Sequence, residues 1–243
     1  MERTSATEAE PPIDVVREPP PPPPRQRWRL VLARSADAPA LAGRDLADAW
    51  GAALDASGLP VFRAPGKVRA RLAFGAPIPV GLVAEQELAD ILLTELLPVW
   101  QVREALVAHL PAGWRLLDLH DVWLGGQALA AQVAAADYRI DVGAADSKAI
   151  GAAIETVLRA RELPRQRQKG GSAVTYDLRP LLVGLGVAAA GPPVLLRTRT
   201  RFHPVLGTGR PEEVVAALGD VAGMPLVIGS VVRERLVLAN EMD

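Results

Sequence analysis

The chain has 243 residues, 49% of them hydrophobic, and this length allows one large domain or two small ones. Its 27 basic and 28 acidic residues give a formal net charge of −1, which excludes a global attraction to nucleic acid and leaves only local charge clusters for that purpose. The absence of cysteine excludes disulfides, thiolate zinc sites and cysteine-ligated iron–sulfur clusters; the histidines lack the spacing of a metal site, so no metal or other cofactor is expected.

Residues 1–25 are predicted to be a disordered tail. They contain "EPPPPPPR", a proline run that favours extended polyproline II conformation and cannot pack into a core. The run is either a solubilising extension or a ligand for a proline-binding domain. The polar start "MERTSATEAEPP" is unlike a secretory signal, and the uncharged stretch 180–196 is short for a membrane span and interrupted by glycine and proline. We therefore expect a cytoplasmic protein without a membrane partner.

The first predicted unit covers residues 26–124 and has the order β-α-β-β-α-β. Its expected elements are strand 27–35, helix 40–60, strands 67–75 and 85–95, helix 98–111 and strand 114–124. In the first strand, apolar residues alternate with Arg27 and Arg29, which predicts one solvent-exposed face. Gly58 and Pro98 mark the end of one helix and the start of the next. This order is that of a ferredoxin-like fold.

The second predicted unit covers residues 137–240 and repeats the order. Its expected elements are strand 137–143, helix 146–164, strands 172–185 and 193–204, helix 210–219 and strand 225–238. Pro211 and Gly219 mark the two ends of the last helix. The predicted fold is therefore α+β, with two ferredoxin-like halves that form a pseudo-repeat after the Pro-rich tail and meet at a junction near 125–137.

Several phrases of the chain resemble one family when their order and spacing are considered together. They are "GRDLADAWGAALDASGLPVFRAP", "RLAFGAPIPVGLVAEQELADILL", "LLDLHDV", "ADYRIDV", "YDLRP" and "GRPEEVVAAL". Over roughly residues 26–238 the chain is similar to the radical SAM-linked family of unknown function. Members of that family are fused to the C-terminus of B12-binding-type radical SAM proteins or encoded beside them.

The chain departs from the pattern of this family at two places. The family usually has a His before the Asp of its first helix, where this chain has Arg44 before Asp45. It usually has a Gly-Phe-Asn-Pro-His-Pro-like loop before the second strand, where this chain reads "FRAPGKVRA". If those His and Asn residues take part in a reaction in the family, this chain has lost that reaction or performs it with other residues. The resemblance implies a separately encoded radical SAM enzyme as partner, acting on RNA or ribosomal components, and no reaction for this domain itself.

Three basic clusters are the candidate phosphate-binding sites. Their members are Arg63, Lys67, Arg69 and Arg71; Arg165, Arg167 and Lys169; and Arg197, Arg199 and Arg201. The last three alternate along one strand and therefore share a face of the sheet. Clustered Lys and Arg bind phosphate, and a ferredoxin-like sheet leaves one face free of helices to present them.

Two considerations qualify this reading of the clusters. Apart from Tyr176, the stacking aromatic residues of an RNA-recognition motif are missing near them, so backbone contact is expected rather than base reading. The alternative is a solvated face on which the arginines form ordinary ion pairs. The acids expected as partners in that case are Asp118, Asp121, Asp141 and Glu85.

The stretch "RQRQKGGSAVTYDLRP", residues 165–180, divides into a predicted loop and a predicted strand. Like charges and two glycines predict that "RQRQKGG" is a mobile, exposed loop anchored by "YDLRP". Asp177 is either a general base with Arg179 as an anion anchor, or both residues bond neighbouring loops. Asp45 is a third catalytic candidate, with a helix-dipole role as its alternative. His120, in a predicted strand, is expected to be a packing residue.

The sequence supports two functional hypotheses. The first is a non-catalytic accessory protein that binds RNA or a ribonucleoprotein through an Arg-rich sheet face and loops, and presents it to a separate radical SAM enzyme. Without cysteine, this chain cannot ligate the cluster of such an enzyme. The alternative is an enzyme that acts on a nucleotide or RNA base, with Asp177 and Arg179 in a cleft between the halves. We expect the non-catalytic role.

Overall fold

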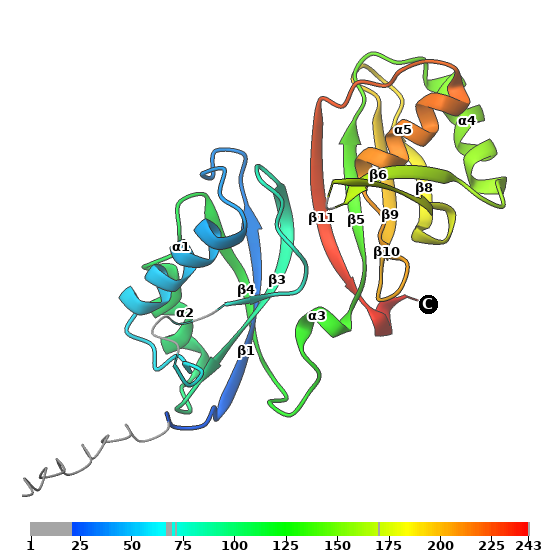
Figure 1. Ribbon diagram of the computed structural model, residues 1–243. Helices are drawn as coiled ribbons and strands as arrows, with labels where there is room; N and C mark the ends of the chain where they lie inside the picture. The colour runs from blue at the N-terminus through cyan, green and yellow to red at the C-terminus, as the bar shows by residue number, and fades with distance from the viewer. Residues whose placement is uncertain (1–20, 67–69, 71, 170, 243) are drawn as a thin grey trace, which may run out of the picture.

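The computed structural model describes residues 21–66, 70, 72–169 and 171–242. They form a mixed α+β structure with a large, mostly antiparallel sheet and five α-helices (Figure 1). The predicted α+β class is confirmed. Of the predicted tail, residues 1–20 lie outside the described residues, and residues 21–25 contain no helix or strand.

The first half contains six elements. They are β1 (Gln26–Arg34), α1 (Gly43–Ala56), β2 (Ala73–Phe74), β3 (Val83–Leu93), α2 (Val99–Val107) and β4 (Trp114–Val122). The strand order is β4-β1-β3-β2, with every pair antiparallel. Helix α1 buries Leu46, Trp50 and Leu54, which recur every four residues and so share one side of the helix. The strand predicted at 67–75 is short in the structure, and residues 67–69 and 71 lie outside the described part.

The prediction of a solvent-exposed face on β1 is wrong, because both faces of this strand are buried. Arg27 and Arg29 each donate from Nε to Asp90 of β3, at 2.8 Å and 2.9 Å. The guanidinium of Arg27 also donates to the carbonyl oxygens of Gly126 and Gln127, at 3.2 Å and 2.9 Å. The predicted junction therefore covers this face of the first half instead of serving only as a linker.

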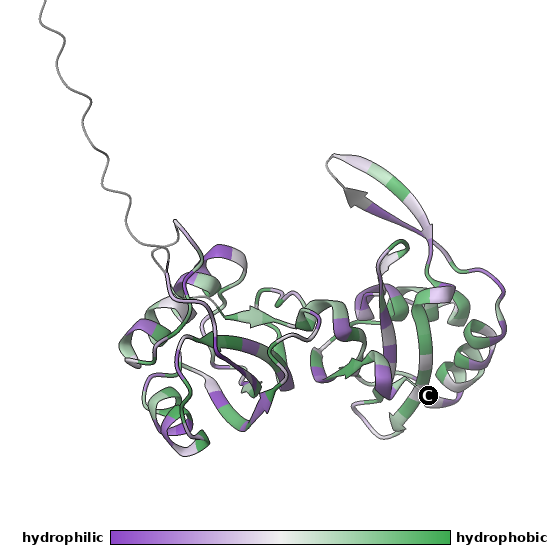
Figure 2. Ribbon diagram, turned by 90° about the horizontal axis from the view of Figure 1, so that it is seen from below, coloured by the Kyte–Doolittle hydropathy of each residue, from purple (hydrophilic) through white to green (hydrophobic). Residues whose placement is uncertain are grey.

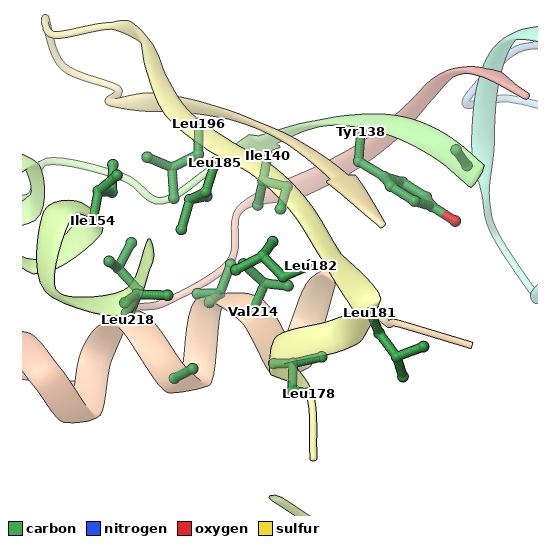
Figure 3. Close-up of a cluster of buried hydrophobic side chains, with 14 of the residues drawn as sticks. Tyr138, Ile140, Ile154, Leu178, Leu181, Leu182, Leu185, Leu196, Val214 and Leu218 are labelled. Carbon is green, nitrogen blue, oxygen red and sulfur yellow. The ribbon is translucent and has the colours of Figure 1, made fainter. Parts of the chain in front are cut away.

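The second half contains the remaining elements. They are α3 (Leu129–Gln132), β5 (Val133–Asp141), α4 (Ser147–Arg159), β6 (Pro164–Lys169), β7 (Ser172–Asp177), the 3-10 turn η1 (Arg179–Leu181), β8 (Leu182–Ala189), β9 (Leu195–His203), β10 (Gly207–Thr208), α5 (Pro211–Ala222), β11 (Ser230–Leu238) and the 3-10 turn η2 (Ala239–Glu241). Strands β8, β9, β5 and β11 are neighbours in that order. Ile140 and Leu196 of this sheet meet Ile154 of α4 and Leu218 of α5 in an aliphatic core (Figure 3).

The prediction of a mobile loop at "RQRQKGG" is also wrong. Residues 165–169 of this stretch lie in β6, which pairs antiparallel with β7 from Pro164↔Asp177 to Lys169↔Ser172. Figure 2 shows the hairpin extending from the second half. The sequence does contain a hairpin signal, because a glycine pair is typical of tight hairpin turns. The single strand predicted at 172–185 is accordingly two strands, β7 and β8, separated by η1.

The two halves share one sheet because β11 pairs in parallel with β3 at Val232↔Val83 and Arg233↔Ala84. Beside this seam, Arg233 of β11 forms a buried ion pair with Glu87 of β3. Arg34 of β1 is a second buried cation, and its positive charge acts to lower the pKa of Glu87. One carboxylate therefore balances two buried guanidinium groups at the centre of the molecule.

Across the described ranges, every helix is too short or too polar to cross a membrane.

Candidate functional site

Two cross-strand rows of residues lie on the sheet face of the second half that faces away from α4 and α5. Directly paired residues of antiparallel strands point to the same face. The first row runs across β8, β9, β5 and β11 and consists of Gly184, Arg199, Asp137 and Arg235. The second row runs across β8, β9 and β5 and consists of Gly186, Arg197 and Arg139. The residues that alternate with these, such as Ile140 and Leu196, point into the core under the helices (Figure 3).

Five arginines on this face form what we call the arginine face. They are Arg139, Arg197, Arg199, Arg201 and Arg235. The structure thus brings together the third predicted cluster, on β9, and adds one arginine from β5 and one from β11.

Asp137 holds two of these arginines in place. Its carboxylate accepts from Arg199 at 2.7 and 2.9 Å and from Arg235 at 3.0 Å. Burial alone would raise the pKa of Asp137, but the hydrogen bonds and charges of Arg199 and Arg235 outweigh it and hold the pKa below its ordinary value. Asp137 therefore stays ionised and fixes both guanidinium groups.

A β-bulge brings a second carboxylate to the same face. The pairing of β11 with β5 shifts between Arg233 and Arg235, and Glu234 is the extra residue. Its carboxylate accepts from Arg139 and from Arg197, at 2.8 Å each. The hydrogen bond that Arg197 donates to Glu234, followed by the negative charge of Glu234, raises the pKa of Arg197, so this guanidinium is firmly cationic.

The carboxylates lie beneath the arginines. The side chains of Asp137 and Glu234 are each 13% exposed, whereas those of Arg197 and Arg235 are 62% and 41% exposed. Arg201 is exposed, and among the described residues its side chain has no hydrogen-bond or ion-pair partner. A ligand that approaches this face therefore meets guanidinium groups first.

A hollow of about 760 Å³ opens beside these arginines. It is lined by residues 183–188 of β8 together with Asp137, Arg197, Arg199, Glu234 and Arg235. Gly184 and Gly186 contribute no side chain, and a Cβ added at either position would meet no atom within 4 Å. At these two positions β8 presents bare backbone to the hollow, where other residues would place a side chain.

The other two predicted clusters do not join this face. In the first, Arg63 pairs with Asp55 at 2.6 Å, and Lys67, Arg69 and Arg71 lie outside the described residues. In the second, on the hairpin, Arg165 pairs with Asp220 at 2.6 Å, and Arg167 lies 4.9 Å from the centre of the Tyr176 ring. Lys169 is the last residue of β6.

The acids expected as partners of the arginines are distributed differently from the prediction. Glu85 binds Arg139 of the arginine face at 2.6 Å. The other three have partners elsewhere: Asp118 binds Arg103 and His120, Asp121 binds Gln26, and Asp141 accepts from the backbone N–H of Gly143. Because cross-strand register decides which charges meet, Asp137 and Glu234 hold the arginines instead.

Asp177 and Arg179 are bonded to nearby backbone. The carboxylate of Asp177 accepts from the N–H groups of Leu163 at 2.7 Å and Arg179 at 2.9 Å. The guanidinium of Arg179 donates to the carbonyl oxygens of Leu158, Ala160 and Leu182. These bonds tie the end of α4 to the start of β8, and neither residue lines the hollow beside the arginines. The geometry favours the structural alternative for both residues.

Asp45 and His120 show no constellation that would support chemistry. Asp45 lies exposed in the first turn of α1, where a carboxylate complements the helix dipole. His120 is not a packing residue as predicted, because its side chain is 53% exposed and lies 3.3 Å from Asp118. Within the described ranges, no cluster of three or more His, Asp or Glu side chains could hold a metal ion.

Sequence reasoning missed Asp137, Arg139, Glu234 and Arg235. A signal was present for the first two, because Asp137 and Arg139 alternate with buried residues just as the arginines of β9 do. The bulge that brings Glu234 to this face has no comparable signal in the chain.

Comparison with known proteins gives low-identity structural neighbours. One is a chain in the crystal structure of a Cbf5-Nop10-Gar1 complex, with 10% identity and a TM-score of 0.45, covering 85% of this chain and 49% of that one. A second is from the archaeal box H/ACA sRNP Nop10-Cbf5 complex, with 9% identity, a TM-score of 0.41, and coverage of 85% and 47%. The chain thus spans about half the length of these two matches.

A third neighbour is an unknown protein from Galdieria sulphuraria, with 17% identity, a TM-score of 0.24, and coverage of 86% and 98%. No curated protein matches the chain. A family model described as an uncharacterized protein conserved in bacteria, DUF2344, matches residues 27–210, which is more than half of the chain. The chain therefore belongs to the DUF2344 family.

Proposed function

We propose that this protein is a non-catalytic RNA-binding subunit that holds the phosphate backbone of RNA on its arginine face. The observation that carries the proposal is the layering of charge on this face. Asp137 and Glu234 are 13% exposed and lie under arginines that are 29–62% exposed. Guanidinium groups match phosphate oxygens with paired N–H donors, and clustered arginines bind polyanions.

The shared carboxylates lower the entropic cost of binding. A free arginine loses rotamer freedom when it binds phosphate, about 0.5–1.5 kcal/mol for each ordered side chain. Arg199 and Arg235 are already ordered by Asp137, and Arg139 and Arg197 by Glu234. Arginine carries five N–H donors, and these ion pairs use only one or two of them. The remaining donors are available to a phosphate.

The proposed partner enzyme is a radical SAM protein encoded separately. Two features support this part of the proposal: the resemblance of the chain to the radical SAM-linked family, and the lack of any cysteine that could ligate a cluster in this chain. Purification of the tagged chain from native lysate, followed by identification of bound protein and RNA, tests it. Recovery of neither a radical SAM protein nor RNA would contradict the accessory role.

We further propose that the halves 26–124 and 137–240 are two copies of a ferredoxin-like unit. The strand orders β4-β1-β3-β2 and β11-β5-β9-β8 support this, because both follow one connectivity once the hairpin β6–β7 is set aside as an insertion. An experimental structure in which the Cα traces of the two halves fail to superpose would contradict it.

The RNA proposal is tested by a charge-matched pair of variants. The test variant is R197Q/R199Q/R201Q, and the control R25Q/R115Q/R159Q removes the same number of charges at exposed positions outside the arginine face. Fluorescence anisotropy with a labelled oligouridylate of roughly 20 nucleotides, longer than the roughly 4–16 that single-strand-binding folds cover, gives Kd at several salt concentrations.

The test variant should bind more weakly than wild type, and the slope of log K against log salt should fall by about 2, since each lost phosphate contact removes about 0.7 for single strands. The control should keep both the affinity and most of the slope. Equal weakening in both variants would show that net charge, and not this face, determines binding.

A further inference from the structure

The structure assigns a role to Gly184 and Gly186 that charge alone does not reveal: we propose that they form the floor of a groove that admits the sugar–phosphate backbone of RNA to the arginines. This inference rests on the proposed RNA-binding function and names the part of the RNA that enters. It makes these two glycines binding-site residues, although neither carries a functional group.

The register places both glycines beside the arginines that would hold the phosphate. Gly184 pairs with Arg199 and Gly186 with Arg197, so in both pairs glycine and arginine share the face. The two glycines alternate with Leu185, whose side chain is buried in the core on the opposite face. The sequence "GLG" therefore combines a core contact with an empty outer surface.

The glycines are not required by the backbone. Neither has a positive φ, and a Cβ at either position would meet no atom within 4 Å. Glycine inside a strand weakens it, and β-branched residues are favoured there. Two glycines thus occupy strand positions where a Cβ has open space and where strands generally favour a β-branched residue. A side chain at either position would enter the 760 Å³ hollow beside Arg197 and Arg199.

The lining of the hollow indicates which part of an RNA would occupy it. Aromatic side chains, on which bases stack, are absent from the residues that line it. The donors present are arginine N–H groups, and in the described part of the chain β8 pairs with β9 along one edge only, which leaves backbone groups on its other edge. These donors suit phosphate oxygens, so the backbone enters the groove, the bases point outward, and binding is independent of sequence.

The inference is tested by filling the groove without changing charge. The variant G184V/G186V is compared with G191V, which lies beyond β8, outside the lining of the hollow, and also has open space around its Cβ. Binding is measured by anisotropy with oligouridylate and with oligocytidylate of the same length, and stability by thermal melting. The groove variant should bind both oligomers at least about tenfold more weakly, the equivalent of one lost charged hydrogen bond, with an unchanged or higher Tm. The control should match wild type.

Each other outcome overturns a definite part of the account. Wild-type affinity in G184V/G186V together with weak binding in R197Q/R199Q/R201Q refutes the groove and leaves the arginine face standing. Wild-type affinity in both variants, or no RNA binding by wild type, refutes the proposed function and the groove together. If the double variant melts at a lower temperature, its weaker binding could reflect lost stability. The variant G186A then replaces it in the binding assay, because a single added methyl group meets no atom within 4 Å. An affinity for G186A equal to that of wild type would then count against the groove.

Discussion

Replacement of Glu87 with Gln should lower the free energy of unfolding by about 4 kcal/mol, because it removes the counter-ion of two buried cations. Glu87 is 0% exposed, and Arg233 and Arg34 are each 2% exposed. A buried charge that loses its partner typically costs about 3–5 kcal/mol. Gln keeps the shape of Glu, so the change tests charge and not packing.

The contacts of the two arginines indicate where the cost of E87Q falls between about 3 and 5 kcal/mol. After the substitution, Arg233 keeps its bond to the carbonyl oxygen of Pro77 at 3.2 Å, and Arg34 keeps its bonds to the carbonyls of Leu82 and Pro39 at 2.6 and 2.7 Å. These neutral partners soften the loss but supply no negative charge. Because one substitution removes the counter-ion of two cations, the cost should exceed the lower limit of about 3 kcal/mol.

A mutant cycle followed by urea unfolding measures the effect. The variants are E87Q, R233M and E87Q/R233M, and the double variant should cost less than either single change because it leaves fewer charges buried. Burial raises the pKa of Glu87, and Arg233 partly offsets this, so R233M removes the offset. A carboxyl whose folded-state pKa is raised contributes most stability below its unfolded pKa and loses it as pH rises. The cost of R233M should therefore be smaller at pH 5 than at pH 7.

Two results would refute this reasoning. One is an E87Q variant within about 1 kcal/mol of wild type, which would mean that water or protein dipoles already stabilise the two arginines. The other is a double variant whose cost equals the sum of the two single costs, which would show that Glu87 and Arg233 do not interact energetically.

Three further predictions follow from the hydrogen bonds and ring contacts. D177A should cost about 2 kcal/mol in urea unfolding by leaving two backbone N–H groups unpaired, with RNA affinity unchanged; lost affinity at wild-type stability would contradict the structural role. R167A should lower Tm by the equivalent of about 1 kcal/mol because it loses its contact with Tyr176, and a wild-type Tm would argue against that contact. The pKa of Asp137 is held low, so its contribution to stability is lost as pH falls through that value; D137N should flatten the acid side of the stability profile, and an unchanged profile would oppose this.

Local patterns in the sequence predicted where most elements lie. Helix α4 falls within the predicted helix at 146–164, and its buried residues recur at helical spacing. The alternation in β9 correctly placed Arg197, Arg199 and Arg201 on one face. In these cases the information is contained within a few neighbouring residues.

Features that depend on distant segments were predicted poorly. The pattern of β1 indicated which side of the strand carries Arg27 and Arg29, but not that residues 126–132 cover that side. The partners of the arginine face depend on strand register and on the bulge at Glu234, neither of which alternation specifies. The hairpin β6–β7 was misread because charge was given more weight than the glycine pair, which is typical of a tight hairpin turn.

Mapping the site at which RNA crosslinks to the wild-type chain tests the central claim most directly. Oligouridylate that carries a photoreactive group on its phosphate backbone is bound and irradiated, the protein is digested, and its crosslinked peptides are identified by mass spectrometry. The account predicts adducts on the peptides of β8, β9 and β11, which carry Gly184, Gly186 and three of the arginines around the hollow. Adducts confined to the first half, or to the hairpin β6–β7, would contradict it.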